Sequence, residues 1–150
     1  MRIAVGSDHR GAAMRARIAG LLVSLGHEVV DAGTSDGRSV DYPDIAAAVA
    51  RRVSVSEVER GILICGTGLG VSIAANKFPG VRAAPCHDEL TADLSRRHNN
   101  LNVLCLSGDI LGDEQMGRLV EIWLTTEFEG GRHARRLAKI AAMERRNGRP

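Results

Sequence analysis

The 150-residue sequence lacks a strong charge imbalance and any long hydrophobic run. Lysine and arginine total 20 against 18 aspartates and glutamates, so the net charge of +2 gives no general reason to expect nucleic-acid binding. No apolar run approaches the roughly 18 residues of a membrane span. The chain opens directly on a strand-like segment, and no signal peptide is expected. We therefore expect a cytoplasmic protein with neither membrane nor nucleic-acid partners.

Cysteine is also scarce. The three cysteines, Cys65, Cys86 and Cys105, are odd in number and lack the spacing of metal ligands. Each lies in or closes an apolar run, which favours free thiols in a reducing compartment. The sequence therefore predicts neither a disulfide framework nor a metal site.

Strand-like runs alternate with helical patterns along the chain. The apolar content of 44% and the charged content of 25% are typical of a globular protein, and the length suits one domain, residues 1–150. The strand-like runs are 3–5, 28–30, 61–65, 81–85 and 103–106. This alternation predicts an α/β fold with a mostly parallel five-stranded sheet, covered by helices on both faces in three layers.

Polar residues follow four of these five runs. They are Ser7-Asp8-His9, the segment 65–70, Cys86-His87-Asp88 and Ser107-Gly108-Asp109. In open parallel sheets, ligands bind beyond the carboxyl ends of the strands. The pattern therefore predicts a small-molecule site along one edge of the sheet, although any single residue could be a cap or a turn.

The segment CGTGLG at 65–70 is the most informative of these. Its glycines allow backbone N–H groups to approach a ligand closely, and the start of the following helix favours anions. It lacks the Gly-Lys-Ser/Thr of a P-loop and does not lie in the first strand–helix unit, where a dinucleotide site would be. A structural turn without ligand is the alternative.

Cys65 places a potentially reactive thiol at the start of this loop. A thiol beside a helix N-terminus has its thiolate favoured, and a thiolate can act as a base or a nucleophile near neutral pH. The neighbouring N–H groups could then stabilise an oxyanion. A base beside an anion hole can remove a proton alpha to a carbonyl. The alternative is a small buried hydrophobic side chain, which is what we expect of Cys86 and Cys105.

Other ionisable residues fit the same chemistry. His98 ends a predicted helix, and could either favour that helix end or act as a general acid or base. Asp8 and His9 offer an acceptor and a titratable donor. Arg132 and Arg136 are four residues apart on one helix face and could clamp an anion, or simply form a solvated face. Spacing alone indicates an α/β enzyme acting on a small anionic carbonyl compound.

Together these segments resemble one family over nearly the whole chain: the type B ribose-5-phosphate isomerases, with the related galactose-6-phosphate and allose-6-phosphate isomerases. The matching segments are GSDHRG, DYPD, GILICGTGLGVSIAANKFPGVRA, SRRHNN, NVLCL and EGGRHARR. The resemblance implies a Rossmann-like fold, sites at the interface of a homodimer or of a tetramer built from dimers, and aldose–ketose isomerisation of a sugar phosphate without metal or organic cofactor.

The resemblance also implies residue roles. Cys65 resembles the base that moves a proton between C1 and C2, and Thr67 a contact near these carbons. His98 resembles the group that opens the sugar ring, with Asp8 at the other end of that proton transfer. Part of the family uses a glutamate later in the loop, but VSIAAN contains no acid, which places the chain in the cysteine branch. The implied substrate contacts are His9, Tyr42, Gly66, Gly68, Leu69, Gly70, Asn99, Asp109, Arg132 and Arg136.

Asp109 departs from the family pattern. Family members usually carry a phosphate-binding arginine after the fifth strand, where this chain has Asp109. An acid beside a desolvated phosphate costs on the order of several kcal/mol. Asp109 could turn away, another cation such as Arg135 could compensate, or the substrate could differ. Ribose 5-phosphate is the leading substrate; another sugar phosphate (allose 6-phosphate, galactose 6-phosphate or a tetrose phosphate) and a non-catalytic phosphate-binding module are the alternatives.

Overall fold

The structure, a computed structural model, describes residues 1–33 and 39–148. Its strands are β1 (Arg2–Ser7), β2 (Glu28–Asp31), β3 (Arg60–Cys65), β4 (Ala83–Pro85) and β5 (Val103–Ser107). Its helices are the short 3₁₀ helix η1 (His9–Gly11), α1 (Ala12–Ser24), α2 (Tyr42–Ser54), α3 (Leu69–Ala75), α4 (Glu89–Asn99), α5 (Asp113–Thr125) and α6 (Gly131–Arg146). The predicted alternation of strands and helices is confirmed.

The five strands form one sheet in the order β2-β1-β3-β5-β4, and every neighbouring pair is parallel. The predicted α/β class is therefore confirmed. β5 is buried along its whole length and lies inside the sheet, whereas the short β4 ends in Pro85 and forms an edge. Proline suits an edge because it has no N–H to donate to a further strand. The order of strands reverses between β1 and β3, which is where ligands bind in such sheets.

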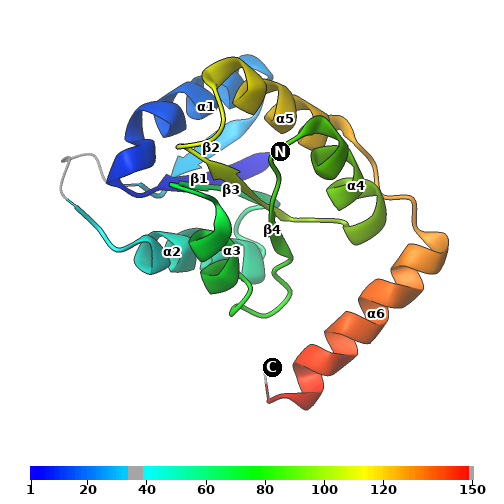
Figure 1. The fold of residues 1–150 in the computed structure, drawn as a ribbon. Coiled ribbons are helices and arrows are strands. Elements are labelled where there is room, and N and C mark those ends of the chain that lie inside the picture. Colours follow the sequence, from blue (N-terminus) through cyan, green and yellow to red (C-terminus); the bar gives the residue numbers. More distant parts are fainter. Residues whose placement is uncertain (34–38, 149–150) are drawn as a thin grey trace.

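Helices cover both faces of the sheet (Figure 1). Alternate strand residues face opposite sides. Ile62 and Ile64 of β3 therefore pack in the core beneath α1, α4 and α5, while Leu63 and Cys65 pack in the core with α2 and α3. The single tryptophan, Trp123, is fully buried in the first core. The predicted three-layer arrangement follows from this alternation.

Local sequence signals explain where several helices begin and end. Asp88 caps α4 by accepting a hydrogen bond from the Thr91 N–H at 2.8 Å. Pro43 lies in the first turn of α2, where its missing N–H costs nothing. Gly26 follows α1 with φ of +79°, a left-handed conformation that ends the helix.

A buried arginine fixes the turn between α4 and β5. Arg96 donates from Nη1 to the Leu101 carbonyl at 2.6 Å and to Asn100 Oδ1 at 2.8 Å. Burial, together with the nearby Arg60 and Arg82, lowers the pKa of this guanidinium to about 10. The contacts hold the end of α4 against the amino end of β5.

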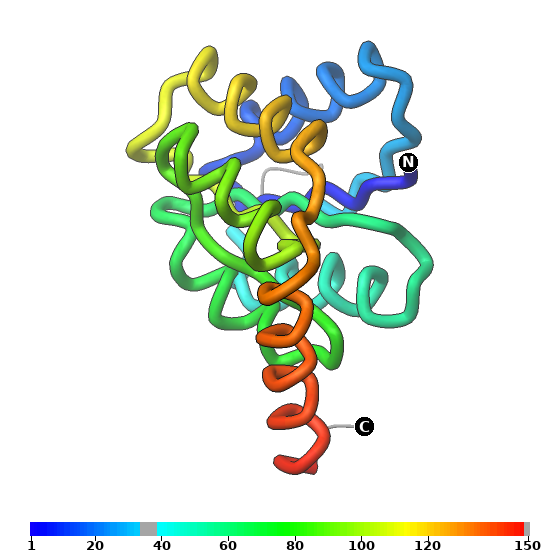
Figure 2. Tube along the Cα trace, turned by 90° about the vertical axis from the view of Figure 1, so that its right-hand side faces the viewer, coloured from blue at the N-terminus to red at the C-terminus, as the bar shows by residue number. Residues whose placement is uncertain are grey.

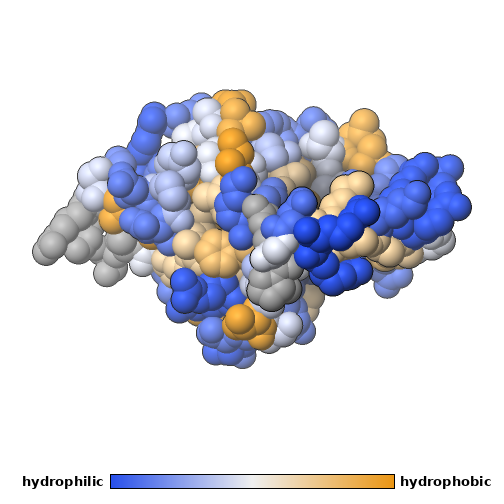
Figure 3. Space-filling view, turned by 90° about the horizontal axis from the view of Figure 1, so that it is seen from below, coloured by the Kyte–Doolittle hydropathy of each residue, from blue (hydrophilic) through white to orange (hydrophobic). Residues whose placement is uncertain are grey.

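Helix α6 projects away from the rest of the molecule (Figures 1 and 2). Its first turn contacts α4 through the buried His133, but most of its later residues are exposed, including Ile140 and Met143. Seen from below, the surface carries separate hydrophobic patches among hydrophilic residues (Figure 3). Among the described residues, no helix combines the length and the apolar character needed to cross a membrane.

Candidate active site at the carboxyl edge of the sheet

Cys65 is the last residue of β3 and lies at the carboxyl edge, as predicted. Its side chain is only 5% exposed, and its sulfur accepts a hydrogen bond from the Gly68 N–H at 3.2 Å. Gly68 has a φ of +77°, which side-chain-bearing residues rarely adopt. The left-handed turn at Gly68 therefore brings a backbone donor back onto the thiol.

The other two thiols differ from Cys65 in their surroundings. Cys86 and Cys105 are buried, and burial raises the pKa of both thiols. These cysteines remain protonated near neutral pH and serve as packing groups, in line with their expected role. All three cysteines are free.

The rest of the glycine loop is held by side chains from three other elements. Ser107 donates from Oγ to the Gly66 carbonyl at 2.6 Å. His87 donates from Nε2 to the Thr67 carbonyl at 3.0 Å, because a carbonyl oxygen can only accept. The Tyr42 ring packs over Gly70, where a Cβ would lie 2.6 Å from Tyr42 Cε2. Thr67 accepts at its own Oγ1 from the N–H of the exposed Leu69 at 3.3 Å.

Asp8 and His9 follow β1, the neighbour of β3. Asp8 is 7% exposed, and its Oδ1 accepts hydrogen bonds from the N–H groups of Arg10 at 3.0 Å and Gly11 at 3.2 Å. Asp8 therefore caps η1, while His9 is exposed beside it. Both lie at the same edge as Cys65, as the strand-end rule predicted.

Asp109 forms an ion pair with Arg10, which lies directly after His9. Its Oδ2 lies 2.8 Å from Arg10 Nη2. The charge of Asp109 is therefore paired with a cation in the chain. The cation is Arg10, however, and not Arg135, which lies on the distant α6.

The remaining predicted residues lie at the opposite edge of the sheet. His98 and Asn99 end α4, from which the chain enters β5 at its amino end. Arg132 and Arg136 lie in the first turns of α6 beside them. Because β3 runs for six residues, or about 20 Å, between the two edges, one chain does not bring these residues to Cys65.

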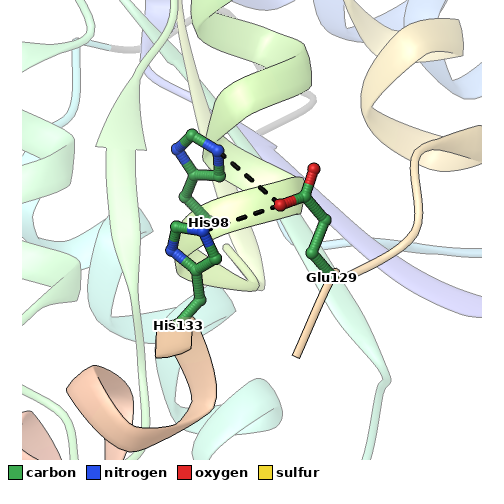
Figure 4. Close-up of side chains that lie close together, drawn as sticks. All are labelled: His98, Glu129 and His133. Atoms are coloured by element: carbon green, nitrogen blue, oxygen red, sulfur yellow. Dashed lines mark ion pairs between the residues drawn. The ribbon is translucent and has the colours of Figure 1, made fainter. Parts of the chain in front are cut away.

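His98 belongs to a cluster with Glu129 and His133 (Figure 4). The two imidazoles are stacked with centroids 4.2 Å apart and planes 5° from parallel. Glu129 Oε2 lies 3.9 Å from His98 Nε2 and 3.6 Å from His133 Nε2. Burial, followed by the neighbouring His98, lowers the pKa of His133.

The ligand atoms of this cluster lie within 4.8 Å of one another, which is close enough for a metal site. The ring geometry argues against one, because a ligated metal lies in the plane of each imidazole and two parallel planes do not meet. Arg132 Nε also lies 3.4 Å from His133 Nε2, and Arg97 Nη1 lies 3.4 Å from Glu129 Oε1. Two cations therefore lie against His133 and Glu129, which further disfavours a metal ion at this cluster.

Fold and site define an α/β protein with a thiol, a glycine loop and cationic side chains at the switch point of a parallel sheet. The sequence profile of the ribose/galactose isomerase family matches residues 3–140. The chain belongs to this family.

Individual relatives match over almost their whole length. The sequence is 47% identical over 145 residues to ribose-5-phosphate isomerase B of Escherichia coli, covering 97% of each chain. The structure of ribose-5-phosphate isomerase B from Clostridium thermocellum aligns with a TM-score of 0.95 at 48% identity, over 98% of this chain and 99% of that one. The enzyme from Mycoplasma genitalium, solved with bound ribulose 5-phosphate, aligns with a TM-score of 0.93 at 44% identity over 96% of both chains.

Proposed function

We propose that the protein interconverts ribose 5-phosphate and ribulose 5-phosphate. The observation that carries this proposal is the buried Cys65 thiol, which lies within a glycine loop and accepts a backbone hydrogen bond. The membership in the ribose/galactose isomerase family and the names of its relatives support the choice of substrate. The proposed location is the cytoplasm.

The proposed reaction moves one proton between two adjacent carbons. The Cys65 thiolate removes the C2 proton of the open-chain aldose, and the electron pair shifts to form a C1–C2 enediolate. N–H groups of the glycine loop stabilise the developing negative charge on oxygen. Cys65 returns the proton to C1, while the hydroxyl proton passes from O2 to O1 and leaves the carbonyl at C2. Thr67, beside Cys65, contacts the reacting carbons.

We further propose that two copies of the chain complete each site. His98 and Asn99 supply ring opening and a sugar contact, with Asp8 of the other chain completing the proton transfer, and Arg132 and Arg136 bind the phosphate. These residues are separated from Cys65 by the length of β3 within one chain. The projecting α6, with its exposed apolar residues, is the element that a second copy would cover. A homodimer would bring these residues to Cys65 of the other chain and would also cover the apolar residues of α6.

Replacement of Cys65 by alanine tests the catalytic proposal. Cys65→Ala should abolish isomerisation of ribose 5-phosphate and leave the affinity for inorganic phosphate nearly unchanged, because only the proton-transferring group is lost. Cys86→Ala is the matched control, since Cys86 is also a buried thiol and directly follows β4, another strand of the same sheet. It should retain activity. An active Cys65→Ala variant would remove Cys65 as the base.

Asp109 favours a second candidate, an isomerase of another sugar phosphate. Asp109, paired with Arg10, stands where the resemblance leads us to expect a phosphate-binding arginine, so the groups that a substrate meets at this edge differ from that pattern. Comparison of kcat/KM for ribose 5-phosphate, allose 6-phosphate, galactose 6-phosphate and erythrose 4-phosphate separates the candidates. The leading proposal requires that ribose 5-phosphate has the highest value; a higher value for another sugar would transfer the assignment to it.

A further inference from the structure

The ion pair between Arg10 and Asp109 bridges the mouth of the glycine loop. Arg10 follows β1 and Asp109 follows β5, and these strands flank β3 on its two sides. The pair therefore passes over the end of β3, where Cys65 and Gly66 lie. Asp109 is anchored there by its backbone N–H, which donates to the Gly66 carbonyl at 3.1 Å.

Gly66 makes room for this pair. A Cβ at position 66 would lie 2.8 Å from Asp109 Oδ2 and 3.5 Å from Arg10 Nη1. A Cβ there would displace the Asp109 carboxylate, whereas its distance to the guanidinium is an ordinary contact. The absence of a side chain at position 66 therefore lets the pair lie directly against the loop that carries Cys65.

The pair is poorly suited to a purely stabilising role. The Arg10 and Asp109 side chains are 60% and 42% exposed, and exposed ion pairs contribute little to stability. A guanidinium has five N–H donors, and one carboxylate cannot occupy them all. Arg10 is held through Nη2 by Asp109, its Nη1 lies beside Gly66, and the side chain is exposed, so donors remain for a ligand that enters the loop.

The charges of Arg10 and Asp109 determine how this edge of the site interacts with an anionic substrate. Asp109 alone would place an uncompensated negative charge against a loop that is proposed to receive an anion. Arg10 cancels this charge and adds N–H groups that can donate to phosphate or enediolate oxygens. Bidentate or charge-assisted contacts of this kind need an oriented guanidinium, and the carboxylate of Asp109 supplies that orientation.

We propose that Arg10 is a substrate-binding cation of this site and that Asp109 is the residue that positions it. This inference rests on the proposed isomerase function and adds a specificity-determining pair to it. Arg10 binds the anionic sugar phosphate, while Asp109 orients Arg10 and has its own negative charge cancelled by that pairing.

Kinetics and phosphate binding of three variants test the proposal. Arg10→Ala should raise KM for ribose 5-phosphate by about tenfold to a hundredfold, the loss expected for a charge-assisted hydrogen bond, with kcat changed much less. Its Kd for inorganic phosphate, measured by calorimetry, should rise in parallel. Arg17→Ala is the matched control: Arg17 is similarly exposed at 62% and pairs with Asp113. It should leave both values unchanged.

The double variant tests whether Arg10 cancels the negative charge of Asp109 at this site. Arg10→Ala leaves the Asp109 carboxylate unpaired, so Arg10→Ala/Asp109→Ala should bind phosphate and substrate more tightly than Arg10→Ala alone. Unchanged KM and phosphate Kd in Arg10→Ala, or a double variant no better than the single one, would overturn the proposal. Calorimetry needs no turnover, so an inactive native protein would refute the isomerase function and still leave the role of Arg10 in phosphate binding testable.

Discussion

Gly68 provides the sharpest test of how the backbone shapes the candidate site. Its φ of +77° lies in the left-handed region, which costs an alanine about 1–2 kcal/mol. A Cβ at this position would lie 3.4 Å from backbone atoms of Leu106, an ordinary contact that adds no severe clash. Gly68→Ala should therefore destabilise the protein by about 1–2 kcal/mol, or about 2–8 °C in Tm for a chain of this size.

Gly20→Ala is a control that should change the free energy of unfolding in the opposite direction. Gly20 lies exposed within α1, where a Cβ would meet no atom within 4 Å. Gly20→Ala should stabilise the protein by about 0.5–1 kcal/mol, because alanine is the better helix former. Both variants are measured by urea unfolding at one fixed protein concentration. The reasoning fails if Gly68→Ala matches the native protein in stability or if Gly20→Ala is less stable than the native protein.

Two further substitutions test local contacts. Asp88→Ala removes the cap of α4 and its bond to the Thr91 N–H, and should lower the free energy of unfolding by about 1 kcal/mol in urea titrations; no loss would contradict the capping role. Burial and the neighbouring His98 lower the pKa of His133, so its protonation costs more in the folded than in the unfolded protein. Its contribution to stability is complete above about pH 6.5, the unfolded pKa, and is lost as the pH falls below it. Tm should therefore fall on acidification, less steeply in His133→Gln than in the native protein or the control His27→Gln, and equal slopes in all three would refute this origin.

Sequence patterns predicted the fold and one half of the site because both depend on local signals. The buried run of β3 and the glycines after it identify Cys65 as a strand-end residue without any knowledge of the neighbours. The pairing of Arg10 with Asp109 depends instead on β1 and β5 flanking β3, and the alternation of strands and helices does not encode this order. Arg10 was therefore missed, although it lies directly beside His9.

The position of His98 shows a second limit to what sequence patterns predict about the site. Helices of a parallel sheet return the chain from the carboxyl edge to the amino edge, so a residue that ends such a helix lies away from the strand-end site. This topology alone places His98, at the end of α4, far from Cys65. Glu129 and His133 lie in the family-like segment EGGRHARR, but nothing in the sequence pairs them with His98, because that proximity arises from the way α6 leaves the domain.

A subunit-mixing experiment tests the central claim, that one site joins Cys65 of one chain to His98 of another. Cys65→Ala and His98→Asn proteins, each inactive or nearly so on ribose 5-phosphate, are unfolded together, refolded as a mixture and assayed. A mixed dimer would hold one intact site of two, and random pairing makes half of all dimers mixed, so about a quarter of native activity should return. Mixing that restores no activity, while the native protein refolded in the same way is active, would contradict a shared site.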